Sequence, residues 1–99
     1  MSTWHFKKGK RESGFLEIDL ILNTATRHVE GFRGYMSLLS REDPNTATVL
    51  TLWQDEATLK KTETGTIKDA VRKVQHLLES PPCIENFKVF STELFQRSE

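Results

Sequence analysis

The fold is decided by the stretch Gly31-Phe32-Arg33-Gly34-Tyr35-Met36-Ser37-Leu38-Leu39-Ser40, which is followed by Thr46-Ala47-Thr48-Val49-Leu50-Thr51-Leu52-Trp53. The intervening segment, Arg41-Glu42-Asp43-Pro44-Asn45, has the composition of a turn. Two runs rich in β-branched and aromatic residues on either side of such a turn predict an antiparallel β-hairpin.

The second run of this hairpin is apolar on both faces. Side chains alternate along a strand, so Val49 and Trp53 point to one face and Leu50 and Leu52 to the other. An antiparallel sheet in contact with water normally keeps one face polar. The second apolar face therefore predicts a cover, and in a chain of 99 residues we expect that cover to be a second copy.

The region before the hairpin is expected to hold a short strand, Thr3 to Lys7, and then a helix. The helical region fits two patterns. Strand-like alternation is shown by Leu16, Ile18, Leu20 and Leu22, and helical spacing by Phe15, Ile18, Leu22, Ala25 and Val29. We predict a helix because the helical spacing extends further and Glu30-Gly31 supplies a stop with glycine just past the end.

The region after the hairpin is expected to hold an interrupted helix and a last strand. Asp55 can cap the helix, because its carboxylate can accept hydrogen bonds from unpaired amides of the first turn. Thr64-Gly65-Thr66 interrupts the helix, and Thr66-Ile67-Lys68-Asp69 resembles a capping box that restarts it. Ser80-Pro81-Pro82 ends it. The last strand is predicted from Asn86 to Gln96.

The predicted order of elements is β-α-β-β-α-β, which is the ferredoxin-like arrangement of the α+β class. It places two helices on one face of a four-stranded antiparallel sheet. The length suits a single domain over residues 1–99. We expect a homodimer formed through the sheet face that the helices leave open.

Composition argues against several classes of partner. Fourteen basic and fourteen acidic residues cancel, so no global field predicts binding to nucleic acid or to a membrane. The single cysteine, Cys83, and a start without a signal peptide's apolar core favour a cytoplasmic protein. No metal site is predicted, because His5, His28, His76 and Cys83 lack close ligand spacing.

Four features, in this order and spacing, resemble one known family. They are Phe6-Lys7-Lys8-Gly9-Lys10, Gly31-Phe32-Arg33-Gly34-Tyr35, Leu50-Thr51-Leu52-Trp53 before Asp55-Glu56-Ala57, and Leu77-Leu78-Glu79-Ser80-Pro81-Pro82. The chain resembles the antibiotic biosynthesis monooxygenase (ABM) family of dimeric α/β-barrel proteins over nearly its whole length. The resemblance implies homodimers with sheets packed face to face and a pocket between the helices and the sheet of each subunit.

The family includes cofactor-independent oxygenases of aromatic polyketides, haem-degrading enzymes, and many proteins with no established activity. Haem-degrading relatives use an asparagine on the first strand and a tryptophan and a histidine on the second helix. Here residues 2–8 contain no asparagine, and residues 56–79 contain no tryptophan and one histidine, His76, outside the apolar helix stripe. We therefore expect no haem turnover and no cofactor.

The candidate site residues are histidines and aromatic side chains. His5 is the candidate general base, because imidazole accepts a proton near neutral pH, and His28 is a reserve base. Tyr35 is the candidate donor to a substrate oxygen, and Trp53 and Trp4 are candidate substrate-binding walls. For each of them the alternative is an ordinary packing or surface role.

A basic cluster, Lys7, Lys8, Lys10 and Arg11, lies at the predicted start of the first helix and could hold an anion or form a solvated turn. Three functions remain open. The first is a cofactor-independent monooxygenase acting on an aromatic or other small apolar metabolite. The second is a non-catalytic dimer that binds a small ligand or another protein, and the third is an isomerase-type enzyme on the same scaffold.

Overall fold

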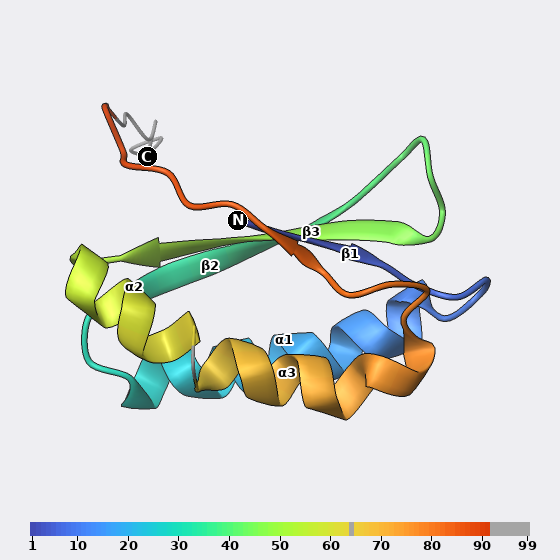
Figure 1. Ribbon diagram of the computed structural model, residues 1–99, viewed down its shortest axis with the longest axis horizontal. Helices are drawn as coiled ribbons and strands as arrows, with labels where there is room; N and C mark the ends of the chain where they lie inside the picture. Colours follow the sequence, from blue (N-terminus) through green and yellow to red (C-terminus); the bar gives the residue numbers. More distant parts are fainter. Residues whose placement is uncertain (64, 92–99) are drawn as a thin grey trace, which may run out of the picture.

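The computed structural model describes residues 1–63 and 65–91, and the side chains of Thr62 and Glu63 are not described. The elements in chain order are β1 (Ser2–His5), α1 (Arg11–His28), β2 (Phe32–Leu39), β3 (Thr46–Trp53), α2 (Glu56–Glu63), α3 (Thr66–Val74), the 3-10 turn η1 (Gln75–Leu77) and β4 (Cys83–Ile84). Their arrangement is shown in Figure 1.

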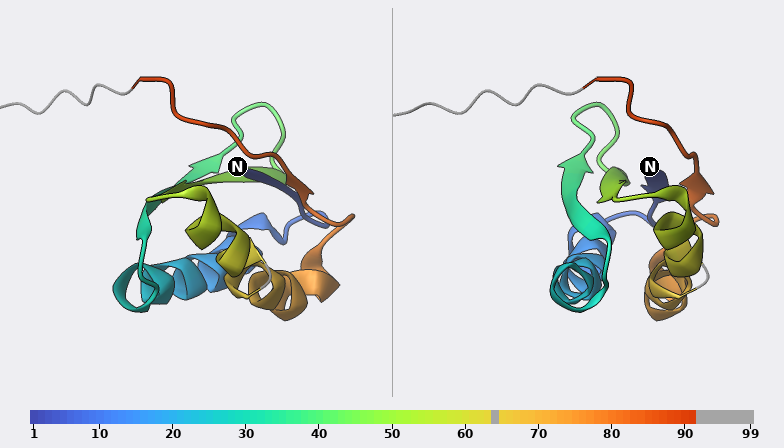
Figure 2. Two further views of the ribbon diagram at one scale, coloured as in Figure 1. Left: turned by 60° about the vertical axis from the view of Figure 1, so that its left-hand side comes forward. Right: turned by 90° about the vertical axis from the view of Figure 1, so that its left-hand side faces the viewer.

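The four strands form one antiparallel sheet in the order β2-β3-β1-β4. Both long helices lie on the same side of it, with α1 beneath β2 and α3 beside α1 (Figure 2). This confirms the predicted α+β, ferredoxin-like fold. Among the described residues, no helix is both long enough and apolar enough to cross a bilayer.

The core lies between the helices and one face of the sheet. Strands contribute the buried side chains of Trp4, Phe6, Phe32, Ala47 and Val49. Helices contribute Phe15, Ile18, Leu22, Ala25, Ala70 and Val74. The helical spacing in α1 is thus confirmed, because the residues that fit only the strand pattern, Leu16 and Leu20, are 68% and 65% exposed.

The opposite face of the sheet, which we call the outer face, is apolar and uncovered. Met36 is paired with Leu50, and Leu52 lies on the same face two residues further along β3. Met36 and Leu52 are 55% and 43% exposed, and Leu50 is half-buried. The two-sided pattern predicted for the hairpin is therefore present, and nothing in the described chain covers its second side.

The helix cap at Asp55 is confirmed and the capping box is not. The Oδ1 atom of Asp55 accepts hydrogen bonds from the amide and the hydroxyl of Thr58, at 2.8 and 2.7 Å. The prediction that Thr66 caps α3 was wrong, because Thr66 is already the first helical residue and Gly65 takes the capping position without a side-chain bond. Thr64, part of the predicted break, lies outside the described residues.

The prediction of the last strand was also wrong. β4 is the pair Cys83–Ile84, bonded to Thr3 and Ser2 of β1. The amide of Glu85 still donates to the carbonyl oxygen of Met1 at 2.8 Å, and among the described residues the pairing with β1 extends no further. Within the described chain, residues 86–91 run away from the sheet without secondary structure (Figure 1). Residues 92–96 of the predicted strand lie outside the described part.

Candidate functional site

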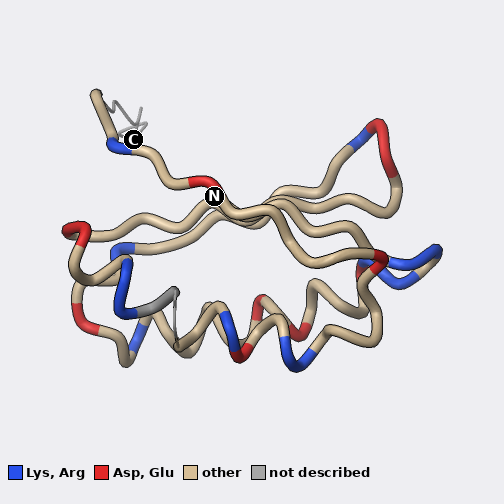
Figure 3. The backbone as a smooth tube through the Cα atoms, in the orientation of Figure 1, with Lys and Arg blue, Asp and Glu red and all other residues tan. Residues whose placement is uncertain are grey.

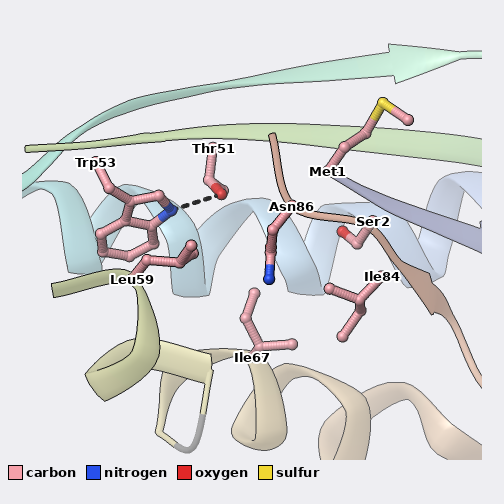
Figure 4. A pocket seen from close by; sticks show the side chains of 8 residues that line it. All are labelled: Met1, Ser2, Thr51, Trp53, Leu59, Ile67, Ile84 and Asn86. Atoms are coloured by element: carbon pink, nitrogen blue, oxygen red, sulfur yellow. Dashed lines mark hydrogen bonds between the residues drawn. The ribbon is translucent and has the colours of Figure 1, made fainter. Parts of the chain in front are cut away.

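A pocket opens between the sheet, the helices and the segment that follows β4. We call it the indole pocket, and the space that it encloses is only about 20 Å³. It shares Thr51, Trp53, Leu59 and Asn86 with a wider groove of about 680 Å³. Its lining consists of Met1, Ser2, Thr51, Trp53, Leu59, Ile67, Ile84 and Asn86. Figure 4 shows Asn86 reaching into the space above Ile67.

The pocket lies beside the break between α2 and α3. Leu59 comes from α2 and Ile67 from the first turn of α3, so the two apolar side chains stand on either side of the break. Both side chains therefore reach the pocket from the region of the break.

Trp53 forms one wall of the pocket. Its ring stacks on that of Phe32, with centroids 4.4 Å apart and an angle of 24° between the planes. Its indole N–H donates to the Thr51 hydroxyl at 2.9 Å. Stacking and the hydrogen bond together fix the half-buried ring, so that it presents a preformed flat surface to a ligand.

Trp4 does not line the pocket. It is 1% exposed and belongs to the core, and its indole N–H donates to the Ser2 hydroxyl at 2.8 Å. The substrate-binding role considered for Trp4 has no support from this placement, because no ligand can reach a sealed ring. Ser2 lines the pocket in its place.

Ser2 and Thr51 give the pocket two hydroxyl groups with the same arrangement. Each accepts an indole N–H from the tryptophan two residues further along its strand. A hydroxyl that accepts one hydrogen bond still has its own proton to donate. Neither proton has an acceptor within the described residues, so both groups are available to a ligand oxygen.

His5 and Tyr35 lie on opposite faces of the sheet. His5 pairs with Thr46 and Tyr35 with Thr51, and these partners are five positions apart on β3. His5 is half-buried on the outer face, with Nδ1 3.1 Å from the Thr46 hydroxyl. The structure therefore does not bring the candidate base and the candidate donor together within one chain.

Tyr35 faces α1 and tilts against Phe32, with ring centroids 6.5 Å apart. Burial raises the pKa of its hydroxyl, and interactions with Asn23 and Asp19 act in opposite directions on it. The hydroxyl is therefore protonated at neutral pH, and Asp19 accepts its hydrogen bond. It joins the pocket only through Phe32, which contacts both Tyr35 and Trp53.

The remaining candidates lie elsewhere. His28 is exposed at the end of α1 and lines a separate groove between α1 and α3. Of the basic cluster between β1 and α1 (Figure 3), the lysines are exposed, whereas the Arg11 side chain is only 12% exposed and already bonded to carbonyl oxygens of the hairpin. In the described ranges, no group of three His, Cys, Asp or Glu side chains could hold a metal ion.

The fold and the sequence agree with one family. The sequence model described as "Antibiotic biosynthesis monooxygenase", ABM, matches residues 3–73. The chain belongs to the ABM family. The matched range runs from the second residue of β1 to the last but one of α3, and it includes the pocket residues Thr51, Trp53, Leu59 and Ile67. No functionally curated protein matches the chain.

Solved structures of similar fold extend the comparison beyond the ABM match. A protein of unknown function from Nitrosomonas europaea has a TM-score of 0.77 at 22% identity, covering 96% of this chain and 90% of that one. A proposed antibiotic biosynthesis monooxygenase from Bacteroides thetaiotaomicron has a TM-score of 0.75 at 16% identity, covering 97% and 91%. A Pseudomonas aeruginosa protein has a TM-score of 0.72 at 20% identity, covering 91% and 90%. Identities this low establish the fold alone.

Several lining residues of this ABM pocket were not predicted from the sequence. Leu59 and Ile67 carried a signal, since both are apolar and flank the predicted break. No sequence pattern pointed to Ser2, Ile84 and Asn86, because these residues line the pocket only as a result of the pairing of β4 with β1.

Proposed function

We propose that this ABM protein is a homodimer that binds an aromatic or other small apolar metabolite against Trp53, in the indole pocket and the wider groove that shares its lining, and oxidises it with dioxygen, without a metal or organic cofactor. The observation that carries the proposal is the fixed indole of Trp53 facing Leu59 and Ile67. An apolar space with one rigid aromatic wall and a few hydroxyl donors is typical of sites for small aromatic ligands.

The proposed reaction is an oxidation in which dioxygen is the only oxidant. A substrate CH2 group that becomes C=O gives up four electrons, which reduce dioxygen to the new carbonyl oxygen and one water molecule. The protein would hold the substrate, exclude water and stabilise its oxygen as negative charge develops. The hydroxyls of Ser2 and Thr51 line the pocket and would serve that last task.

The proposed dimer forms through the outer face. Leaving Met36, Leu50 and Leu52 in water would expose an apolar patch unusual for a soluble monomer. A stable interface needs roughly 800 Å² from each partner, which is about the area of one sheet face. The exposed Phe87, Val89 and Phe90 beyond β4 would add apolar area to such a contact.

A second function, binding without catalysis, is favoured by the placement of His5 and Tyr35. One chain holds them on opposite faces of the sheet, so a base and a donor acting on one substrate would have to come from two subunits. A binding dimer needs no such pair, and the pocket geometry serves it equally.

Oxygen uptake with a panel of hydroxylated aromatic compounds, in the presence of a chelator, tests the oxygenase. We expect uptake coupled to a product that has gained one oxygen atom and lost two hydrogens. Ile67→Phe, which fills the pocket, should abolish uptake, whereas Leu16→Phe on the exposed side of α1 should not. Quenching of Trp53 fluorescence without oxygen uptake would support the binding dimer, and the absence of both would refute the pocket.

A further inference from the structure

We infer that His5, Thr46 and Asp43 form a proton-accepting site on the outer face, in which Nε2 of His5 accepts a proton or hydrogen bond from a small ligand bearing a weakly acidic hydroxyl group, such as a phenol. Thr46 and Asp43 are positioning residues. The site is distinct from the indole pocket and does not depend on the proposed oxygenase.

Three side chains make a continuous chain of short contacts. The Thr46 hydroxyl donates to Oδ2 of Asp43 at 2.7 Å, and Nδ1 of His5 lies 3.1 Å from the same hydroxyl oxygen. The other carboxylate oxygen of Asp43 accepts the amide of Asn45 at 2.9 Å. Each contact is within ordinary hydrogen-bond distance.

The direction of the hydrogen bond between Thr46 and Asp43 determines the direction of the contact between Thr46 and His5. The Asn45 amide, followed by the Thr46 hydroxyl, lowers the pKa of Asp43 below its ordinary value of 3.8, so the carboxylate is ionised at neutral pH and can only accept. The single hydroxyl proton of Thr46 must then lie on the Asp43 side. The Thr46 oxygen is left as an acceptor, and Nδ1 of His5 must carry the proton.

A neutral imidazole has one N–H and one bare nitrogen. With the proton fixed on Nδ1, the bare nitrogen of His5 is Nε2. This arrangement supplies the orienting carboxylate that a candidate histidine base needs, through a hydroxyl rather than by direct contact. The ring is half-buried, so it is not closed off from solvent.

The charged groups around the turn make their contacts through backbone oxygens. Arg11, from α1, donates to the backbone oxygens of Ser40, Asp43 and Thr46 at 2.8, 3.2 and 3.3 Å and pairs with Glu12. On the other side of β1, Glu79 meets His5 through its backbone amide, which donates to the His5 carbonyl at 2.8 Å. The turn that carries Asp43 is therefore rigidly placed against β1.

Proton–nitrogen correlation spectra of the imidazole rings, recorded well above the ordinary histidine pKa of ~6.5, test the site. We expect the Nδ1–H form for His5. The exposed rings of His28 and His76 serve as internal references for a histidine without the His5–Thr46–Asp43 chain of hydrogen bonds, which we call the relay. Thr46→Val should shift His5 to the reference pattern, and Thr46→Ser should restore the Nδ1–H form.

Ligand binding is tested on the same spectra. Titration with phenol should move the His5 Nε2 resonance in the wild type and in Thr46→Ser, and move it at least severalfold less in Thr46→Val. Benzene, which lacks the hydroxyl, should leave it in place. Wild-type His5 protonated on Nε2, or a Thr46→Val spectrum identical to wild type with the amide spectrum intact, would overturn the relay. A relay without any response to phenol would overturn the ligand site alone.

Discussion

Gly14 packs directly against the ring of Phe6. A Cβ atom at position 14 would lie 2.8 Å from Cδ1 of that ring and nearer still to Cε1. Phe6 is 2% exposed and makes an edge contact with Phe15, so its ring cannot move aside. α1 can approach β1 this closely only because the residue at the contact has no side chain.

Gly14→Ala should therefore destabilise the protein although alanine favours helices. We expect a loss of up to about 2 kcal/mol in the free energy of unfolding, because overpacking costs roughly 1–3 kcal/mol and the higher helix propensity of alanine offsets about 1 kcal/mol of it. Chemical denaturation measures it. Ser13→Ala on the exposed side of α1 should stay within about 0.5 kcal/mol of wild type. In a Phe6→Leu background the Gly14→Ala cost should fall, and an unchanged cost would contradict the contact.

Asp55 should make stability depend on pH through its cap on α2. Bonds from the Thr58 hydroxyl and amide lower its pKa from the ordinary 3.8. Because the folded-state pKa is the lower one, the stabilisation is present above 3.8 and is lost as the pH falls through the folded value. Asp55→Ala should lower the melting temperature at pH 7, and the difference from wild type should shrink in acid. A difference that stays constant with pH would argue against the charged cap.

The outer face should decide the oligomeric state. Leu50→Lys places a charge in the centre of the apolar patch, and we expect it to convert a wild-type dimer to a monomer at micromolar concentration in sedimentation equilibrium. Leu16→Lys, at an exposed position on α1, should leave the dimer intact. A monomeric wild type would contradict the proposed interface.

The Thr51 hydroxyl should contribute to affinity for ligands that carry an oxygen acceptor. Thr51→Val keeps the shape of the side chain and should weaken binding of 1,4-naphthoquinone about fivefold, the size of one neutral hydrogen bond. Naphthalene, without an acceptor, should bind both proteins equally. Thr51→Ser should bind the quinone like wild type. Equal losses for both ligands would point to disturbed packing of Trp53.

Local sequence patterns predicted the helices well, because apolar spacing and helix capping depend on residues close together in the sequence. The 3.6-residue spacing of Phe15, Ile18 and Leu22 fixed α1, and the side chain of Asp55 fixed the start of α2. The capping box failed because the helix begins one residue earlier than the pattern places it, with Gly65 and not Thr66 at the capping position. The last strand failed because its length depends on the strand beside it and not on its own residues.

The site was less predictable than the fold. Trp53 was found from its place at a strand end, but Trp4, at a similar place in its strand, is sealed in the core. The pairing of Asp43 with His5 spans 38 positions of the sequence and depends on the register between β1 and β3. A reading of local spacing could not supply that register.

Arg11 has a consequence for how the chain folds. Its guanidinium, at the first residue of α1, bonds three backbone oxygens around the hairpin turn, some 30 positions away. The turn has hydrogen bonds of its own, such as that from the Asn45 amide to Asp43, but it gains the guanidinium only when α1 docks, so docking of the helix is expected to complete the closure of the hairpin. Contacts between residues far apart in the sequence slow folding, because the chain loses the entropy of closing the loop before the contacts can stabilise it. The same side chain that orders the turn should therefore lie on the slow step of folding.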